Sequence, residues 1–267
     1  MLFSVIIPTC NRDKLLCRCL DRILPPYQQL SSELYEVIVA DDNADDHLVD
    51  ELKGYYPTVK VVKGPRRGPA ANRNAGARMA KGRWLVFIDD DCLPGDYLLS
   101  TYKKEVEKNH VKVLEGCTIV DRQRMRFDEE APYNWFGGNM WSCNFAIEKD
   151  FFFGLGGFDE KFIYPCLEDV DLRVRIERSE TIAFVPLAVV VHEWRRKTAF
   201  RDLRKQLHAH KYFYKKHSQY SVRHIFSRIS RFFKESVKLT AELLKYSFKG
   251  FWAYIEKMIL YFLLIFA

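Results

Sequence analysis

The stretch WLVFIDDD (84–91) consists of five apolar residues followed by three aspartates. Five consecutive apolar residues predict a strand that is buried on both faces of a sheet, because such strands show no alternation of polar and apolar residues. Three adjacent carboxylates repel one another unless a cation neutralises them. We therefore expect a buried strand over 84–91 that carries a cation site at its carboxyl end.

Strands and helices alternate on the N-terminal side of this stretch. Strands are predicted over 3–7 (FSVII), 36–42 (EVIVADD) and 59–63 (VKVVK). Helices are predicted over 13–24, 47–55 and 68–82, and Pro25-Pro26 ends the first of them. This alternation is typical of parallel strands joined by right-handed crossovers, so the sequence predicts an α/β fold.

The alternation continues on the C-terminal side. Residues 97–120 predict a helix and a strand, and residues 131–165, rich in glycine and aromatic residues, predict loops that line a site. A helix over 170–176 and a strand over 181–193 follow. We expect one domain over 1–192, with a first half over about 1–95 and a second half over about 96–192.

Polar residues follow the apolar core of three of the predicted strands. They are Thr9, Asn11 and Arg12 after the first strand, Asp41, Asp42 and Asn43 at the second, and Asp89, Asp90 and Asp91 at the fourth. Ligands of open α/β sheets bind beyond the carboxyl ends of the strands. The three clusters are therefore expected to share one crevice.

The aspartates predict a divalent metal site. On an extended segment Asp89 and Asp91 point the same way, so both could hold one ion. Their hard oxygen ligands suit Mg²⁺ or Mn²⁺, ions that usually sit with substrate phosphates. His192 ends a run of three valines, where it could be a third ligand or a structural histidine. A solvated strand end is the alternative explanation for the aspartates.

Two further groups could carry chemistry. Arg73 lies in a segment of small residues, and its forked donors could meet phosphates or carboxylates. Glu168 and Asp169 precede an apolar helix, where they could cap the helix or deprotonate an acceptor hydroxyl.

Charge divides the chain. Residues 1–192 hold 25 Lys/Arg and 30 Asp/Glu, a net charge of −5, whereas residues 193–267 hold 17 and 5, a net charge of +12. In the second part apolar residues recur with a helical period (Ile225, Phe226, Ile229, Phe232, Phe233, Val237, Leu243, Leu244, Phe248 and Phe251), and between them lie Arg223, Arg228, Arg231, Lys234, Lys238, Lys245 and Lys249. This pattern predicts basic amphipathic helices that bind an anionic membrane surface, or else a hairpin that packs on the domain or a second copy.

No secretory signal and no apolar run of membrane-spanning length is present in the sequence. The seven cysteines have no zinc spacing, so we interpret them as small buried residues in a reducing compartment. We therefore expect a cytoplasmic protein that is peripheral on the cytoplasmic face of a membrane.

Six segments resemble the family 2 inverting glycosyltransferases of GT-A fold, and they occur in that family's order. They are SVIIPTCNR (4–12), ADDNADD (40–46), GPAANRNAG (68–76), GRWLVFIDDDCLP (82–94), GGNMWSCNFAIEKDFFFGLGGFDEKF (137–162) and EDVDLRVR (168–175). The resemblance implies a GT-A-type nucleotide-binding sheet, mixed but mainly parallel and flanked by helices. The first half of this catalytic domain (about 1–95) would bind the nucleotide sugar, and the second half (about 96–192) would bind the acceptor. The basic amphipathic helices of 193–267 would follow the catalytic domain.

The resemblance also implies roles for single residues. Asp169 would be the catalytic base and Glu168 its substitute. Asp91 would hold the metal, with His192 as a third ligand, and Asp89 would act on the ribose or through water. The residues implied for nucleotide-sugar binding are Pro8, Thr9, Asn11, Arg12, Asp42, Arg73, Asp89 and Asp90. The loop of Gly137, Gly138 and Asn139, together with Asn144, would lie near the donor sugar and the acceptor.

Two departures from the family pattern stand out: Cys10 replaces a frequent aromatic residue that can stack on the base, and Asn72 replaces a small alanine before Arg73.

The sequence thus predicts transfer of a sugar from a nucleoside diphosphate sugar, a UDP-sugar first, to a saccharide or lipid-linked saccharide. A catalytically degenerate scaffold at the membrane is the alternative. The segment TCNRD (9–13) lacks the glycine-rich loop of nucleotidylyltransferases and the GxGxxG of dinucleotide-binding oxidoreductases. A nucleic-acid scaffold is not expected, because the tail is rich in phenylalanine and the domain before it is acidic.

Overall fold

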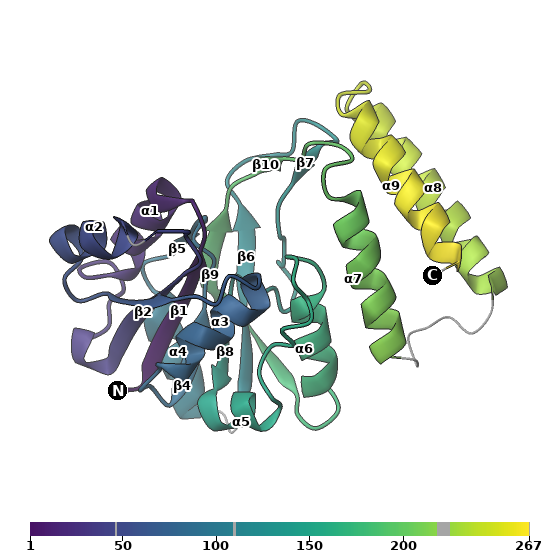
Figure 1. Ribbon diagram of the computed structural model, residues 1–267. Coiled ribbons are helices and arrows are strands. Elements are labelled where there is room, and N and C mark those ends of the chain that lie inside the picture. The colour runs from purple at the N-terminus through teal and green to yellow at the C-terminus, as the bar shows by residue number, and fades with distance from the viewer. Residues whose placement is uncertain (46, 109–110, 218–224, 267) are drawn as a thin grey trace. The chain divides into compact units, whose positions relative to one another are not determined.

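Figure 1 shows a computed structural model of the protein, which describes residues 1–45, 47–108, 111–217 and 225–266. The chain divides into two compact units. The first comprises Met1–Asp121 and Pro132–Glu193, and the second comprises Arg122–Ala131 and Trp194–Ala267. The unit boundary at Glu193 lies one residue beyond the predicted domain end. Residues 122–131, expected in the first domain, group with the second unit.

The first unit is built on a sheet of eight strands in the order β3-β2-β1-β4-β8-β6-β9-β5. Their bounds are β1 (Phe3–Thr9), β2 (Tyr35–Asp41), β3 (Lys60–Lys63), β4 (Trp84–Phe87), β5 (Cys92–Pro94), β6 (Val113–Val120), β8 (Phe145–Glu148) and β9 (Ile182–His192). Four pairings are parallel and three, at β4–β8, β8–β6 and β9–β5, are antiparallel. The predicted mixed sheet is confirmed.

Helices cover both faces of this sheet. Their bounds are α1 (Asp13–Ile23), α2 (His47–Tyr55), α3 (Pro69–Arg78), α4 (Leu98–Lys108), α5 (Lys149–Gly154) and α6 (Glu168–Ile176), with a 3₁₀ turn η1 (Ser32–Leu34) before β2. One hydrophobic cluster joins α1, α2 and α4 to one face, and another joins α3, α5 and α6 to the other face.

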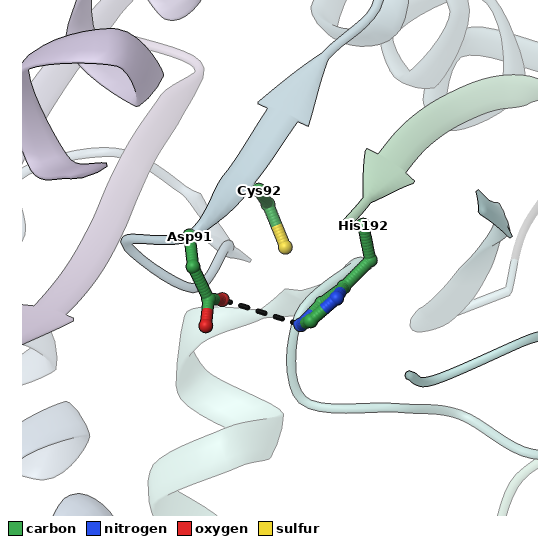
Figure 2. Close-up of side chains that lie close together, drawn as sticks. All are labelled: Asp91, Cys92 and His192. Atoms are coloured by element: carbon green, nitrogen blue, oxygen red, sulfur yellow. Dashed lines mark ion pairs between the residues drawn. The ribbon is translucent and has the colours of Figure 1, made fainter. Parts of the chain in front are cut away.

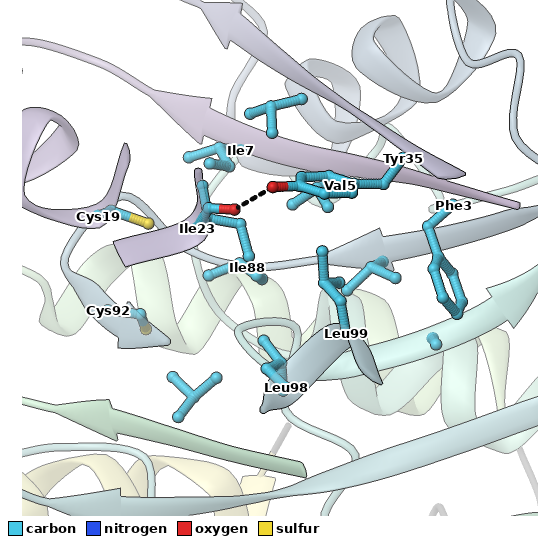
Figure 3. Packing of buried hydrophobic residues seen from close by; sticks show 14 of the residues in the cluster. Phe3, Val5, Ile7, Cys19, Ile23, Tyr35, Ile88, Cys92, Leu98 and Leu99 are labelled. Atoms are coloured by element: carbon cyan, nitrogen blue, oxygen red, sulfur yellow. Dashed lines mark hydrogen bonds between the residues drawn. The ribbon is translucent and has the colours of Figure 1, made fainter. Parts of the chain in front are cut away.

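Alternation along β1 shows how one strand serves both clusters. Val5 and Ile7 belong to the first cluster, and Ile6 belongs to the second. In the first cluster the Tyr35 hydroxyl donates to the Ile23 carbonyl at 3.1 Å (Figure 3). In the second cluster a Cβ on Gly76 would lie 2.7 Å from Ile6, so the small residues of α3 allow a close approach to the sheet.

Two predicted segments differ from the structure. The strand predicted over 84–91 ends at Phe87, and the three aspartates lie in a turn in which the Cys92 amide donates to the Asp89 carbonyl. The segment 131–165, predicted as loops, contains β8 and α5. The apolar run of Phe145–Ile147 in β8 is buried between β4 and β6, and α5 contributes the buried Phe152 to the second cluster.

The second unit is mainly helical, with α7 (Leu203–Lys216), α8 (Ile225–Lys245), α9 (Phe251–Leu263) and the 3₁₀ turn η2 (Leu264–Phe266). α8 and α9 lie side by side (Figure 1), and Leu239, Leu243 and Ala253 pack between them with Phe127. β7 (Glu129–Glu130) and β10 (Arg195–Arg196) form an antiparallel pair. This pairing explains why residues 122–131 belong to this unit.

Arg223 lies outside the described residues, as do the side chains of Ile225, Phe226 and Arg228. Among the helices that the structure describes, none combines the length and the apolar character needed to cross a membrane.

Candidate active site

Asp91 and His192 form a buried pair in the first unit (Figure 2). Antiparallel pairing of β5 with β9 sets Cys92 opposite His192, which places Asp91 next to the histidine ring. The distance from Asp91 Oδ1 to His192 Nε2 is 3.3 Å. The structure thus brings together two of the three predicted metal ligands.

The tautomer of His192 leaves its Nε2 atom able to bind a cation together with the Asp91 carboxylate. Nδ1 lies 2.7 Å from the Glu193 carbonyl, which accepts only, so Nδ1 carries a hydrogen. In the neutral ring Nε2 then presents a lone pair towards the Asp91 carboxylate. Two such acceptors repel unless a proton or a cation lies between them, and carboxylate and imidazole together suit Mn²⁺. The donor set fits the predicted metal.

Cys92 was not among the predicted site residues, although its sulfur lies with the Asp91 and His192 ligand atoms in a group that spans at most 4.8 Å. Burial raises the pKa of the Cys92 thiol well above its ordinary value. A neutral sulfur is a poor ligand for a hard cation. Cys92 therefore lines the site. Its position directly after the three aspartates could have identified Cys92 as a residue of the site.

Arg12 and Thr9 orient the middle aspartate. The Thr9 hydroxyl donates to Asp90 at 2.8 Å, and Arg12 Nη1 lies 3.1 Å from Asp90 and 3.0 Å from Asp91 Oδ2. Burial raises the pKa of Asp90 to about 6, and the Arg12 charge opposes this shift. Arg12 contacts one oxygen of Asp91 and His192 faces the other, so Asp91 links two parts of the site.

The carboxyl ends of β1 and β2 lie side by side, and the residues expected to border the nucleoside are found there. Pro8 is buried in β1, whereas Asn11 is exposed with a φ of 54°, and its backbone amide donates to the Asn43 side chain. Asp42 accepts from the Arg66 amide at 2.9 Å, and burial raises the pKa of its carboxyl.

Asn72, which departs from the family pattern, has a structural role. It is buried, and its amide donates to the Ala40 carbonyl at 2.8 Å and to the Thr9 carbonyl at 3.3 Å. These bonds hold the ends of β1 and β2 together.

Arg73 contacts carboxylates, which is one of the two alternatives that the sequence left open. Its guanidinium is buried and donates to Asp89 at 2.6 Å and to Glu168 at 3.0 Å. Burial alone would lower the pKa of Arg73, but the two carboxylates outweigh that effect and raise it. Arg73 is therefore a bridge between the aspartate turn and the start of α6, with its donors turned to carboxylates.

The same contacts separate Asp89 from Asp91. Asp89 pairs with Arg73, whereas Asp91 faces Arg12 and His192. The expectation that both carboxylates share one partner fails here because the segment turns and is not extended, so their side chains do not alternate as on a strand.

Glu168 and Asp169 begin α6 and are both buried. Asp169 accepts from the Val170 amide at 2.8 Å and from the Ser142 amide at 3.4 Å. Burial raises the pKa of Asp169, and burial together with the charge of Asp169 raises the pKa of Glu168 to about 7. Two neighbouring carboxyl groups with raised pKa values can take up a proton near neutral pH.

The glycine loop is held by a residue that sequence reasoning missed. Glu115 accepts from the amides of Gly138 and Met140, the second at 2.7 Å, and a Cβ on Gly137 would lie 2.7 Å from a Glu115 oxygen. Gly137 and Gly138 both have positive φ, and Gly138 and Asn139 are exposed. The signal was a lone acid inside the apolar strand VKVLEGC (111–117).

Asn144, which was expected near the donor sugar and the acceptor, lies apart from that exposed loop in sequence and is buried. The residue accepts from the Tyr102 hydroxyl at 2.7 Å and donates to the carbonyls of Cys117 and Ala188. These bonds occupy both atoms of its amide, so Asn144 joins β8 to β6 and β9.

Known proteins share both sequence and fold with this chain. The family model described as Glycosyl transferase family 2 matches residues 4–157. Validoxylamine A glucosyltransferase of Streptomyces hygroscopicus subsp. limoneus is 28% identical over 239 residues, which is 72% of this chain and 51% of that protein. The chain thus spans about half the length of this relative.

Two solved structures share the fold. S. aureus TarS 1-349 in complex with UDP-GlcNAc has a TM-score of 0.62 at 20% identity, over 74% of this chain and 60% of that chain. GalNAc-T7 with UDP, GalNAc and Mn²⁺ has a TM-score of 0.61 at 21% identity, over 74% and 44%.

Proposed function

Since the chain belongs to glycosyl transferase family 2, we propose that it transfers a sugar from a nucleoside diphosphate sugar to an acceptor hydroxyl, with inversion at the anomeric carbon. One observation carries the proposal. Arg73 bridges Asp89 and Glu168, so one ion-pair network connects the aspartate turn to Glu168, which precedes the proposed base Asp169 at the start of α6. The function is tested by metal-dependent binding of nucleoside diphosphates to the wild type and to Asp91→Ala.

A UDP-sugar is the proposed donor. Asp42 would bind the base, and Pro8, Thr9, Asn11 and Arg12 would border the nucleoside, since they lie at the adjoining ends of β1 and β2. The crystal structure of TarS 1-349 contains UDP-GlcNAc, and that of GalNAc-T7 contains UDP, GalNAc and Mn²⁺, which supports this choice.

Mn²⁺ or Mg²⁺ is the proposed cofactor, held by Asp91 and His192, with Asp89 acting on the ribose or through water. When bound, the ion would neutralise charge that develops on the departing diphosphate. Arg12 lies 3.0 Å from Asp91 and can add positive charge on the same side.

Asp169 is the proposed base. It takes the proton of the acceptor hydroxyl while the hydroxyl oxygen forms a bond to the anomeric carbon from the face opposite the leaving group. The bond from that carbon to the diphosphate oxygen breaks, and the nucleoside diphosphate departs with the bonding electrons. Glu168, next to it and paired with Arg73, is the substitute base.

The rate of transfer should fall as the pH drops below neutrality. Burial raises the pKa values of both Glu168 and Asp169, so a proton occupies the pair at a higher pH than it would an exposed carboxyl. We expect kcat/KM to decline about tenfold per pH unit below a midpoint that lies above the ordinary pKa of an exposed carboxyl, which is the limb expected of an essential base. A pH–rate profile that stays flat to about pH 5, the range of an unperturbed carboxyl, would contradict this assignment.

The acceptor is proposed to be a saccharide or a lipid-linked saccharide used in cell-surface polysaccharide or glycoconjugate synthesis, and no nucleic-acid partner is proposed. The relative from Streptomyces hygroscopicus is named as a glucosyltransferase that acts on validoxylamine A. The case for a lipid-linked acceptor comes from the second unit.

The second unit is proposed to bind the cytoplasmic face of an anionic membrane. Trp252, Ile259, Phe262 and Phe266 are exposed and recur at spacings of seven, three and four residues along α9 and η2. The two charged residues of α9, Glu256 and Lys257, are not exposed. On α8, exposed Phe233, Val237 and Leu244 have the exposed Lys234, Lys238 and Lys245 beside them in sequence. An apolar helix face with neighbouring lysines suits an anionic bilayer surface.

Phe262→Ser/Phe266→Ser should lower co-sedimentation with anionic vesicles about tenfold or more, because burying one Phe side chain stabilises by roughly 1.5–3 kcal/mol. The matched control is Tyr55→Ser/Leu187→Ser, which removes two exposed apolar residues of the first unit. Equal losses in the two variants, or no loss in the first, would exclude α9 as the membrane-binding face.

A further inference from the structure

The second unit contains a pocket of about 600 Å³ that the proposed transfer reaction does not use. Its lining comes from the segments around β7 and β10 and from the junction between α8 and α9. All of these residues lie within the one unit.

Positive charge dominates the pocket. Four cations line it (Arg126, Arg196, Lys197 and Lys249) and Asp128 is its one acidic lining residue. Arg126 pairs with Asp128 through two contacts, at 2.7 and 3.1 Å, and Arg196 contacts the same carboxylate at 3.1 Å. One carboxylate therefore holds two guanidinium groups side by side, and a net positive charge remains to be balanced.

The other two cations strengthen this excess. Lys197 lies 3.4 Å from Glu256, a buried residue outside the lining, so this contact offsets only one of the charges. Lys249 is exposed and has no carboxylate partner among the residues that the structure describes. Arg and Lys donors that converge in this way suit a phosphate group.

The backbone at the start of α9 also adds positive potential at the pocket. α9 has 13 residues and begins at Phe251, on the pocket wall, so the positive end of its dipole lies at the pocket. Gly250 adopts a φ of 99°, and a Cβ there would lie 2.5 Å from the Asp128 amide. The helix start is therefore packed closely against the segment that carries Arg126 and Asp128.

The rim of the pocket is apolar and aromatic. Phe248, Phe251 and Trp252 line the pocket and are exposed, and Trp252 also begins the exposed apolar face of α9 and η2. Charge within the pocket and apolar surface beside it match a molecule with a phosphate at one end and hydrocarbon at the other. A free phosphate would use the cations alone, and a nucleic acid would need cations spread along a surface.

We propose that this pocket binds the phosphate of a lipid headgroup, with the lipid's hydrocarbon lying over Phe251 and Trp252. This inference rests on the proposed membrane association of the second unit, and it names the chemistry that the unit recognises. It is independent of sugar transfer.

The test uses the full chain and soluble short-chain lipids, so that no charged membrane surface contributes. Dihexanoyl phosphatidic acid, dihexanoyl phosphatidylcholine and inorganic phosphate are titrated by calorimetry below the micelle concentration of the lipids. We expect phosphatidic acid to bind at least about tenfold more tightly than either of the others. UDP is titrated in parallel, so that failure of the transferase proposal is seen separately.

Arg196→Gln/Lys249→Gln removes two pocket cations, and its affinity for phosphatidic acid should fall about tenfold or more. Lys211→Gln/Lys215→Gln is the matched control, since it removes two exposed charges of α7 that do not line the pocket, and it should stay within about twofold. Lys249→Gln alone changes no contact of Asp128 and guards against loss of folding in the double variant. Trp252→Ala should weaken binding of phosphatidic acid and leave binding of phosphate unchanged.

Equal losses in the pocket variant and its control would overturn the proposal, because net charge alone would then explain binding. Absence of phosphatidic acid binding at millimolar concentration would also overturn it. Phosphate that binds as tightly as phosphatidic acid, with no effect of Trp252→Ala, would overturn the lipid assignment and identify a site for soluble phosphate.

Discussion

Asp169→Asn is expected to lower the rate of sugar transfer by about 10²–10⁴-fold, the usual contribution of a positioned general base, while nucleotide binding stays within about twofold. The amide keeps the shape of the carboxyl group but cannot accept a proton. The Val170 amide donates to one oxygen of the carboxylate at 2.8 Å and the Ser142 amide to the other at 3.4 Å, so the asparagine can keep its carbonyl oxygen on the shorter contact and loses the longer one. Single-turnover transfer from a labelled sugar donor measures the effect, and calorimetry with the nucleotide measures binding.

Glu168→Gln is the matched control for this variant. It removes the neighbouring carboxylate and leaves Asp169 in place, so a smaller loss is expected. Part of that loss would come from Arg73, which would keep Asp89 as its one charged partner in the bridge. A variant at Asp169 that keeps most of the wild-type rate, beside a Glu168 variant that loses it, would move the role of base to Glu168.

The fold could be predicted because its signals are local. Apolar runs, such as WLVFI (84–88), and the helices between them fix which segments are strands, and the alternation of strands and helices fixes their parallel order. β8 escaped this reasoning because it has four residues and pairs antiparallel between β4 and β6. An antiparallel strand inserted late in the chain leaves no signal in a pattern of parallel crossovers.

The candidate site could be predicted only in outline. The sequence placed Asp91 and His192 near each other through the strand ends, and the structure brings them to 3.3 Å. It could not show that the aspartates turn after Ile88, which sends Asp89 to Arg73 and Asp91 to His192. Turn geometry depends on the partners that each carboxylate finds, and those lie 16 and 101 residues away along the chain.

Buried polar residues are also hard to interpret from a sequence. Asn144 lies within a motif and was expected near the donor sugar and the acceptor, whereas Asn72 was seen only as a departure from the family pattern. Both prove to be buried and bonded to backbone carbonyls. A sequence shows that an amide is present but does not show whether its bonds are satisfied within the protein, which decides whether it can meet a ligand.

Asp91→Ala is expected to abolish the metal-dependent part of nucleotide binding. Asp91 is buried, and it faces His192 through one oxygen and Arg12 through the other. The neighbouring Asp90 is held by Thr9 and Arg12. Loss of a residue that merely supports a ligand often costs 10–100-fold in metal affinity, so loss of a direct ligand should cost at least about 100-fold. Asp96→Ala, which removes an aspartate paired with Arg22, is the matched control and should bind as the wild type does.

The central claim, that this chain binds a nucleoside diphosphate sugar through a divalent metal, is tested most directly by calorimetric titration of UDP, GDP, CDP and dTDP. Each nucleotide is titrated with and without Mn²⁺ into the wild type, Asp91→Ala and Asp96→Ala. We expect UDP to bind the wild type and Asp96→Ala only when Mn²⁺ is present, and we expect Asp91→Ala to lose this binding. Binding of none of the four nucleotides to folded wild-type protein would contradict the account and favour a catalytically degenerate member of the family that acts by binding a membrane or a partner.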